Sequence, residues 1–77
     1  MMAVDIFAPH IVKLDRSLIT DIENDVDKQE YYYYYRDNFH KRGIKVLAEG
    51  IESREEYEFL RDNGIDLAQG FYLGRPE

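Results

Sequence analysis

The chain has 77 residues, 16 of them acidic and 10 basic, which gives a formal net charge of −6 at pH 7. This charge repels phosphate backbones and anionic lipid headgroups, so we expect neither a nucleic-acid polymer nor a membrane as partner. The sequence contains no cysteine, which excludes disulfides and thiolate metal sites and fits a reducing compartment. No stretch approaches the ~20 apolar residues of a membrane span, and we expect a cytoplasmic protein with one small domain.

The first half of the sequence predicts one strand and one helix. Residues 11–15 alternate between apolar and polar side chains and predict a strand. Residues 21–28 are rich in acidic side chains and are interpreted as a solvated connection. A helix is expected from about residue 27 to residue 42, because Gly43 stands where a helix commonly ends.

The second half repeats this order. Residues 44–48 predict a second strand. Ser53, with Glu56 three residues later, forms a capping-box pattern that predicts the start of a second helix, and Gly64 marks its end. A third strand is expected at residues 66–69.

The alternation of strand, helix, strand, helix and strand predicts an α/β fold. Parallel neighbouring strands need long crossovers, and these crossovers are right-handed, so the three strands are expected to form one parallel sheet. Such a sheet has two open edges, which are normally paired, covered or used for assembly.

Five consecutive tyrosines, Tyr31 to Tyr35, lie within the first predicted helix. Five successive side chains point around the whole helix and cannot all face one core. One interpretation is a helix with an aromatic inner face and a hydrated outer face, since tyrosine hydroxyls tolerate water. The other is an adhesive surface for assembly.

Period-two alternation places three polar side chains on one face of the sheet. If the helices cover Val12 and Val46, then Lys13, Glu49 and Gln69 emerge together on the opposite face. They lie near the carboxyl ends of the strands, where parallel α/β proteins bind ligands.

The motifs around these residues resemble a known family. Lys13-Leu14-Asp15, the segment AEGIE at 48–52, QGFY at 69–72 and Pro76 resemble the last strand-end motifs of EAL domains, the barrel-shaped phosphodiesterases that hydrolyse cyclic di-GMP. The separations agree as well, 36 residues from Lys13 to Glu49 and 20 from Glu49 to Gln69. The resemblance implies that residues 1–77 are a partial EAL domain with three strands and two helices, the last third of a (β/α)₈ TIM-like barrel.

The resemblance also implies roles for five residues. Lys13, Glu49 and Gln69 match catalytic positions, with Glu49 a metal ligand or the base for a metal-bound water. Asp15 and Glu52 match supporting positions. The family uses Mg²⁺ or Mn²⁺, and carboxylate and amide oxygens suit these cations.

Other family motifs are missing from the sequence. It has no Glu-Ala-Leu and no adjacent aspartate pair, and twelve residues precede Lys13. We therefore expect a truncated cyclic di-GMP phosphodiesterase that is inactive alone and needs a complementing barrel segment, so whether the chain acts as an enzyme stays open. The alternative is a non-catalytic module that forms homo-oligomers or binds a partner through its open strand edges and tyrosine-rich helix. A weaker alternative is a nucleotide-binding remnant that keeps Lys13 for phosphate contact.

Overall fold

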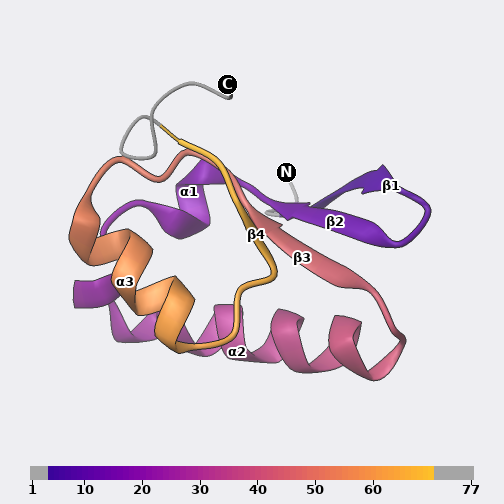
Figure 1. Ribbon diagram of the computed structural model, residues 1–77. Helices are drawn as coiled ribbons and strands as arrows, with labels where there is room; N and C mark the ends of the chain where they lie inside the picture. The colour runs from indigo at the N-terminus through magenta and orange to yellow at the C-terminus, as the bar shows by residue number, and fades with distance from the viewer. Residues whose placement is uncertain (1–3, 71–77) are drawn as a thin grey trace.

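The computed structural model describes residues 4–70, so the motif residues Phe71, Tyr72 and Pro76 lie outside the described part. Figure 1 shows the elements in chain order. They are β1 (Val4–Ala8), β2 (Ile11–Leu14), α1 (Arg16–Ile19), the 3₁₀ turn η1 (Ile22–Asn24), α2 (Val26–Lys41), β3 (Lys45–Ala48), α3 (Arg54–Asp62) and β4 (Leu67–Ala68). No helix in residues 4–70 combines the length and the apolar character needed to cross a bilayer.

The four strands form one sheet in the order β1-β2-β3-β4. The predicted parallel unit is confirmed, because β2 pairs with β3 and β3 with β4 in parallel. The expectation of a purely parallel sheet with two open edges is wrong. A turn at Pro9 and His10 folds β1 back onto β2 as an antiparallel partner, which covers that edge and makes the sheet mixed.

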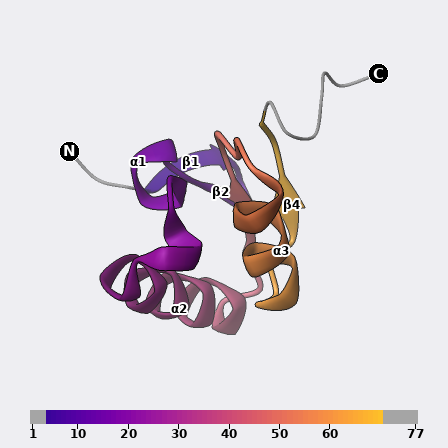
Figure 2. The same ribbon diagram turned by 90° about the vertical axis from the view of Figure 1, so that its left-hand side faces the viewer.

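The helices gather on one side of the sheet, as the two views in Figures 1 and 2 show. The predicted alternation is confirmed on this side, since Val12, Leu14, Val46 and Ala48 are buried in the core. The rest of the buried cluster comes from the helices, the turn and the connections, and consists of Leu18, Ile19, Ile22, Tyr32, Ile51 and Leu60.

The segment between β2 and α2 is more structured than expected. The interpretation of residues 21–28 as a solvated connection is wrong for Ile22, which is fully buried in η1. Leu18 and Ile19 of α1 are buried in the same core cluster. Asp25 caps α2 by accepting the backbone N–H of Lys28 at 3.2 Å.

The tyrosine-rich helix α2 has an aromatic inner face and a hydrated outer face, as the first interpretation predicted. Tyr32 is fully buried, whereas Tyr31 and Tyr34 are 60% and 63% exposed. Burial raises the pKa of the Tyr32 hydroxyl. This hydroxyl donates to the carbonyl of Asn63 at 2.9 Å, and Arg36 donates to the same carbonyl, so α2 is tied to the C-terminal end of α3.

We predict that Tyr32→Phe lowers the free energy of unfolding by about 1 kcal/mol, the usual net contribution of one hydrogen bond. The ring still packs in the core, and Arg36 still supplies one donor to Asn63. Urea denaturation measures the change. Tyr34→Phe, at the exposed outer face, is the matched control, and an equal loss in that variant would contradict the assigned role of the Tyr32 hydroxyl.

Candidate functional site

The carboxyl ends of the three parallel strands are joined by backbone hydrogen bonds. The N–H of Glu49 donates to Leu14 at 3.2 Å, and the N–H of Gln69 donates to Ala48 at 2.9 Å. Ile51 in turn donates to the carbonyl of Gln69 at 3.0 Å. These bonds set the residues that follow each strand side by side.

Lys13 and Glu49 meet at this edge as the sequence predicted. Lys13 Nζ lies 3.1 Å from Glu49 Oε2, and the two side chains are 28% and 39% exposed. The ring of Phe7 in β1 lies against the ammonium, with 5.0 Å from Nζ to the ring centroid, a cation–π geometry. Sequence reasoning missed Phe7, because its contact depends on the unpredicted β1–β2 pairing.

Gln69 occupies the corresponding position after β4. Ala68 pairs with Ala48 in the parallel ladder, so Gln69 follows β4 at the same level as Glu49 follows β3. Its side chain is exposed, and its backbone makes the contacts described above. The approach of its amide group to Lys13 and Glu49 stays a prediction.

Asp15 and Glu52 follow Lys13 and Glu49 closely in the sequence, and their carboxylates bind other residues. Asp15 caps α1, where its Oδ2 accepts the backbone N–H of Ser17 at 2.9 Å. Hydrogen bonds from the Ser17 side chain and backbone hold the pKa of Asp15 below its usual value. Glu52 Oε2 lies 3.2 Å from Arg16 Nη2, an exposed ion pair that links α1 to the loop after β3. No local pattern in the sequence predicted Arg16 as the partner of Glu52, because the two residues are 36 positions apart.

Two motif glycines allow close approaches at the same edge. Gly50 has φ +80°, and a Cβ there would lie 2.8 Å from the Cβ of Arg16. A Cβ on Gly70 would lie 2.1 Å from the carbonyl oxygen of Ile51. Side chains at these positions would therefore push the loop after β3 away from α1 and from the end of β4.

The side-chain oxygens at the strand ends are of the type that binds a hard divalent cation, but they are few. Glu49 offers a carboxylate and Gln69 an amide oxygen, both appropriate to Mg²⁺ or Mn²⁺. Two such side chains are too few to enclose a cation, and Glu49 is also paired with Lys13. A second acidic group, Asp21, Glu23 and Glu56, has oxygens within 4.8 Å of one another. Glu56 directs both of its oxygens to backbone N–H groups, and we assign no cation to this group.

The sequence matches the EAL domain family over residues 3–76, and the chain belongs to this family. The cyclic di-GMP phosphodiesterase NbdA of Pseudomonas aeruginosa is 37% identical over 65 residues, which are 84% of this chain and 8% of NbdA. The chain thus spans about a tenth of the length of its curated relatives.

Solved EAL structures share the fold. A standalone EAL protein from Vibrio cholerae, in its c-di-GMP-bound form, superposes with a TM-score of 0.81 at 38% identity, over 86% of this chain and 28% of that one. The manganese/cyclic di-GMP complex of Klebsiella pneumoniae BlrP1 gives a TM-score of 0.78 at 38% identity, over 84% of this chain and 17% of BlrP1. Metal and nucleotide are properties of those complexes.

We predict that Asp15→Ala lowers the free energy of unfolding at pH 7 by about 1 kcal/mol, because α1 loses its N-cap. The native pKa of Asp15 is depressed, so the ionised cap stabilises the fold above the unfolded pKa. That contribution is lost as the pH falls through the native pKa, so the difference between wild type and Asp15→Ala should begin to narrow below about pH 4, the ordinary pKa of an aspartate, and should continue to narrow as the pH is lowered further.

Urea denaturation across this pH range checks the prediction. Asp15→Asn is the control, since an amide oxygen can still cap the helix without titrating. A difference between wild type and Asp15→Ala that stayed constant down to the lowest pH would rule out an ionised cap.

Proposed function

We propose that the chain forms the closing part of an EAL phosphodiesterase barrel and contributes one side of a cyclic di-GMP site. The observation that supports this most is the Lys13–Glu49 pair at the carboxyl ends of adjacent parallel strands, at 3.1 Å, in a chain of the EAL family. Ligands of parallel α/β proteins bind at this end of the sheet. The parallel strands β2, β3 and β4 would then correspond to three of the eight barrel strands, and the antiparallel β1 would not be one of them.

The residues of this edge suit phosphodiester hydrolysis. Lys13 carries a positive charge that can offset the charge growing on the phosphate oxygens, and its ammonium has three donors, so it can keep Glu49 while contacting a phosphate. Glu49 would ligate the cation, with Gln69 orienting a water or completing the ligand shell. A bound Mg²⁺ or Mn²⁺ would supply a water that is nucleophilic at neutral pH.

The chain alone holds too little of this site for catalysis. A two-cation cluster needs several charged ligands held together, whereas the strand ends described here offer Glu49 and Gln69. The sequence also lacks the Glu-Ala-Leu motif and an adjacent aspartate pair. We therefore infer that hydrolysis requires the remaining strands of the barrel from another segment.

A chimera tests this proposal. The segment of NbdA that matches this chain is replaced by the chain itself, and hydrolysis of cyclic di-GMP is measured with Mn²⁺. We expect turnover by the chimera and none by the isolated 77 residues. Lys13→Ala and Glu49→Gln should each lower kcat/KM of the chimera by about 100-fold or more, the usual effect of removing one group that stabilises transition-state charge.

The control is Lys41→Ala, which removes an exposed cation from the last turn of α2. It should leave kcat/KM unchanged. Product formation by the isolated chain would contradict the inferred incompleteness, and full activity of the Lys13→Ala chimera would contradict the role of Lys13.

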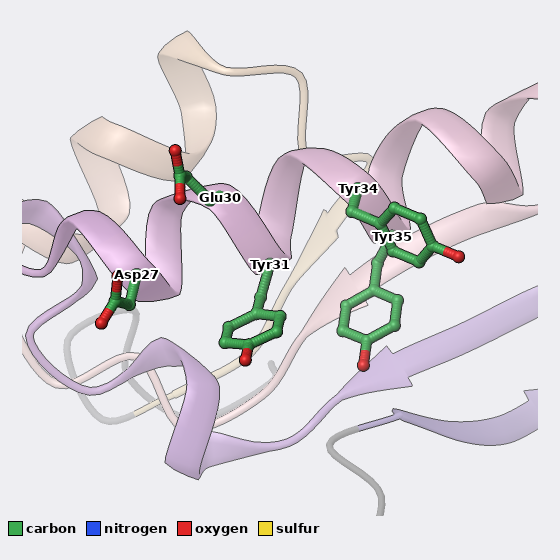
Figure 3. Close-up of a pocket in the computed structure, with 5 residues that line it drawn as sticks. All are labelled: Asp27, Glu30, Tyr31, Tyr34 and Tyr35. Atoms are coloured by element: carbon green, nitrogen blue, oxygen red, sulfur yellow. The ribbon is translucent and has the colours of Figure 1, made fainter.

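A second candidate function is assembly through the exposed tyrosines of α2, Tyr31 and Tyr34. A surface pocket of about 550 Å³ is lined by Asp27, Glu30, Tyr31, Tyr34 and Tyr35. Figure 3 shows Asp27, Tyr31 and Tyr35 pointing to the same side of the helix. Exposed tyrosines are enriched at protein interfaces, because one end of the ring is apolar and the other tolerates water.

Analytical ultracentrifugation tests the assembly function. If α2 mediates self-association, the chain should sediment as a dimer or larger species, and the double variant Tyr31→Ser, Tyr34→Ser should shift it toward monomer. The variant Lys41→Ala, at the far end of the same helix, is the control. A wild-type chain that sedimented as a clean monomer would exclude homo-oligomerisation by this face.

A further inference from the structure

Glu56 is the buried charged side chain of the described residues, with 5% of its surface exposed. It stands in the first turn of α3, where Ser53 Oγ accepts its backbone N–H at 3.1 Å, as the capping-box pattern predicts. The contacts of the Glu56 side chain differ from those of a capping box. A capping-box glutamate usually turns back to the N-cap residue itself, whereas Glu56 accepts two N–H groups from other residues.

The two donors come from different loops. Glu56 Oε1 accepts the N–H of Glu52 at 2.8 Å, in the loop that leads from β3 to α3 and begins with Glu49. Glu56 Oε2 accepts the N–H of Asp21 at 2.9 Å, in the turn that follows α1. Figure 1 shows α1 beside the connection from β3 to α3. One carboxylate thus joins two segments, at Asp21 and Glu52, that are 31 residues apart and follow neighbouring strands.

The contact lies at a turn with an unusual backbone conformation. Asp21 has φ +63°, a left-handed conformation that residues other than glycine, asparagine and aspartate rarely adopt. The N–H of Asp21 lies outside the regular helices and strands, and the carboxylate of Glu56 gives it a charge-assisted partner in a partly buried position.

A second side-chain contact, which joins α1 to the loop after β3, is weak. Arg16 and Glu52 form an ion pair with side chains that are 59% and 41% exposed. Exposed pairs of this kind contribute little, because water screens them and the long side chains lose freedom. The buried Glu56 contacts are therefore the stronger constraint on the loop that follows Glu49.

We propose that Glu56 is a positioning residue that holds Glu49 against Lys13 by fixing the far end of the loop that begins with Glu49. Glu49 is held on one side by its N–H bond to Leu14 and on the other by the anchored N–H of Glu52. The value of this geometry for hydrolysis rests on the function proposed above. The positioning itself is a property of the chain and can be measured without substrate.

Glu56→Gln separates positioning from packing. Glutamine has nearly the same volume, but it has one acceptor oxygen and an NH₂ group that cannot accept an N–H. A residue that only filled space would tolerate the change. A residue that accepts two N–H groups must release one of them.

The experiment is NMR on the ¹⁵N,¹³C-labelled 77-residue chain. Amide hydrogen exchange is followed at Glu52 and Asp21 and expressed as a ratio to exchange at Ile44, whose N–H donates to Phe39 at the other end of β3. This ratio removes any loss of global stability. The contact between Lys13 and Glu49 is followed by the nuclear Overhauser effect between their side-chain protons.

In Glu56→Gln we expect exchange at Glu52 or Asp21 to rise about tenfold relative to Ile44, as for the loss of one hydrogen bond. The Lys13–Glu49 Overhauser effect should weaken in the same variant. Glu55→Gln, at the exposed neighbouring position of α3, should change neither measurement.

Two results would overturn the proposal. Unchanged exchange at both amides would show that Glu56 does not hold the loops. Faster exchange at one amide with an undiminished Lys13–Glu49 Overhauser effect would show that Glu56 holds the loops without positioning Glu49. An inactive NbdA chimera would instead overturn the proposed function alone, because the NMR test involves neither metal nor nucleotide.

Discussion

The parallel register of β2, β3 and β4 is the constraint on which the site depends. Leu14 pairs with Ala48, and Ala48 pairs with Ala68, so the three strands end at the same level. Side chains alternate across a strand, and a slip of one residue would exchange the two faces. Lys13 would then point toward the helices, and a charged group would enter the core. Because burying that charge would be costly, the register that keeps Lys13 out of the core is also the register that places it at the site.

One face of the sheet packs against the helices and stabilises the fold, and the opposite face carries the candidate site. The face under the helices carries Val12 and Val46, which are packed with buried side chains from the helices, including Tyr32 and Leu60. The opposite face carries Lys13 next to Leu47 in the ladder, with Phe7 over the ammonium. The residues that follow the strands gain their positions from backbone hydrogen bonds and from Glu56, so the site is built on rigid elements although its side chains are partly exposed.

Local patterns in the sequence predicted the elements whose causes are local. Ser53 caps α3, and Gly43, with φ +74°, follows the end of α2, because capping depends on a few adjacent residues. The outer face of α2 was also predictable, since five rings in a row must surround a helix. The placement of Lys13 beside Glu49 followed from period-two alternation once the strands were known to be parallel. Their roles came from the family motifs and remain predictions.

The features that the sequence did not predict depend on contacts between distant residues. β1 was not predicted, and its pairing with β2 brings Phe7 to Lys13. The capping pattern identified Glu56 but not its bond to Asp21, because that contact joins segments 35 residues apart. The turn that buries Ile22 lies in a segment whose acidic composition favoured solvent.

Detection of hydrogen bonds between the strand ends in solution tests the account most directly. Couplings transmitted through hydrogen bonds should connect the N–H of Glu49 to the carbonyl of Leu14 and the N–H of Gln69 to the carbonyl of Ala48 in the 77-residue chain. Their observation would establish the register that brings Lys13, Glu49 and Gln69 to one edge. Couplings displaced by one residue along either strand would contradict it, since Lys13 and Glu49 could not then share a face.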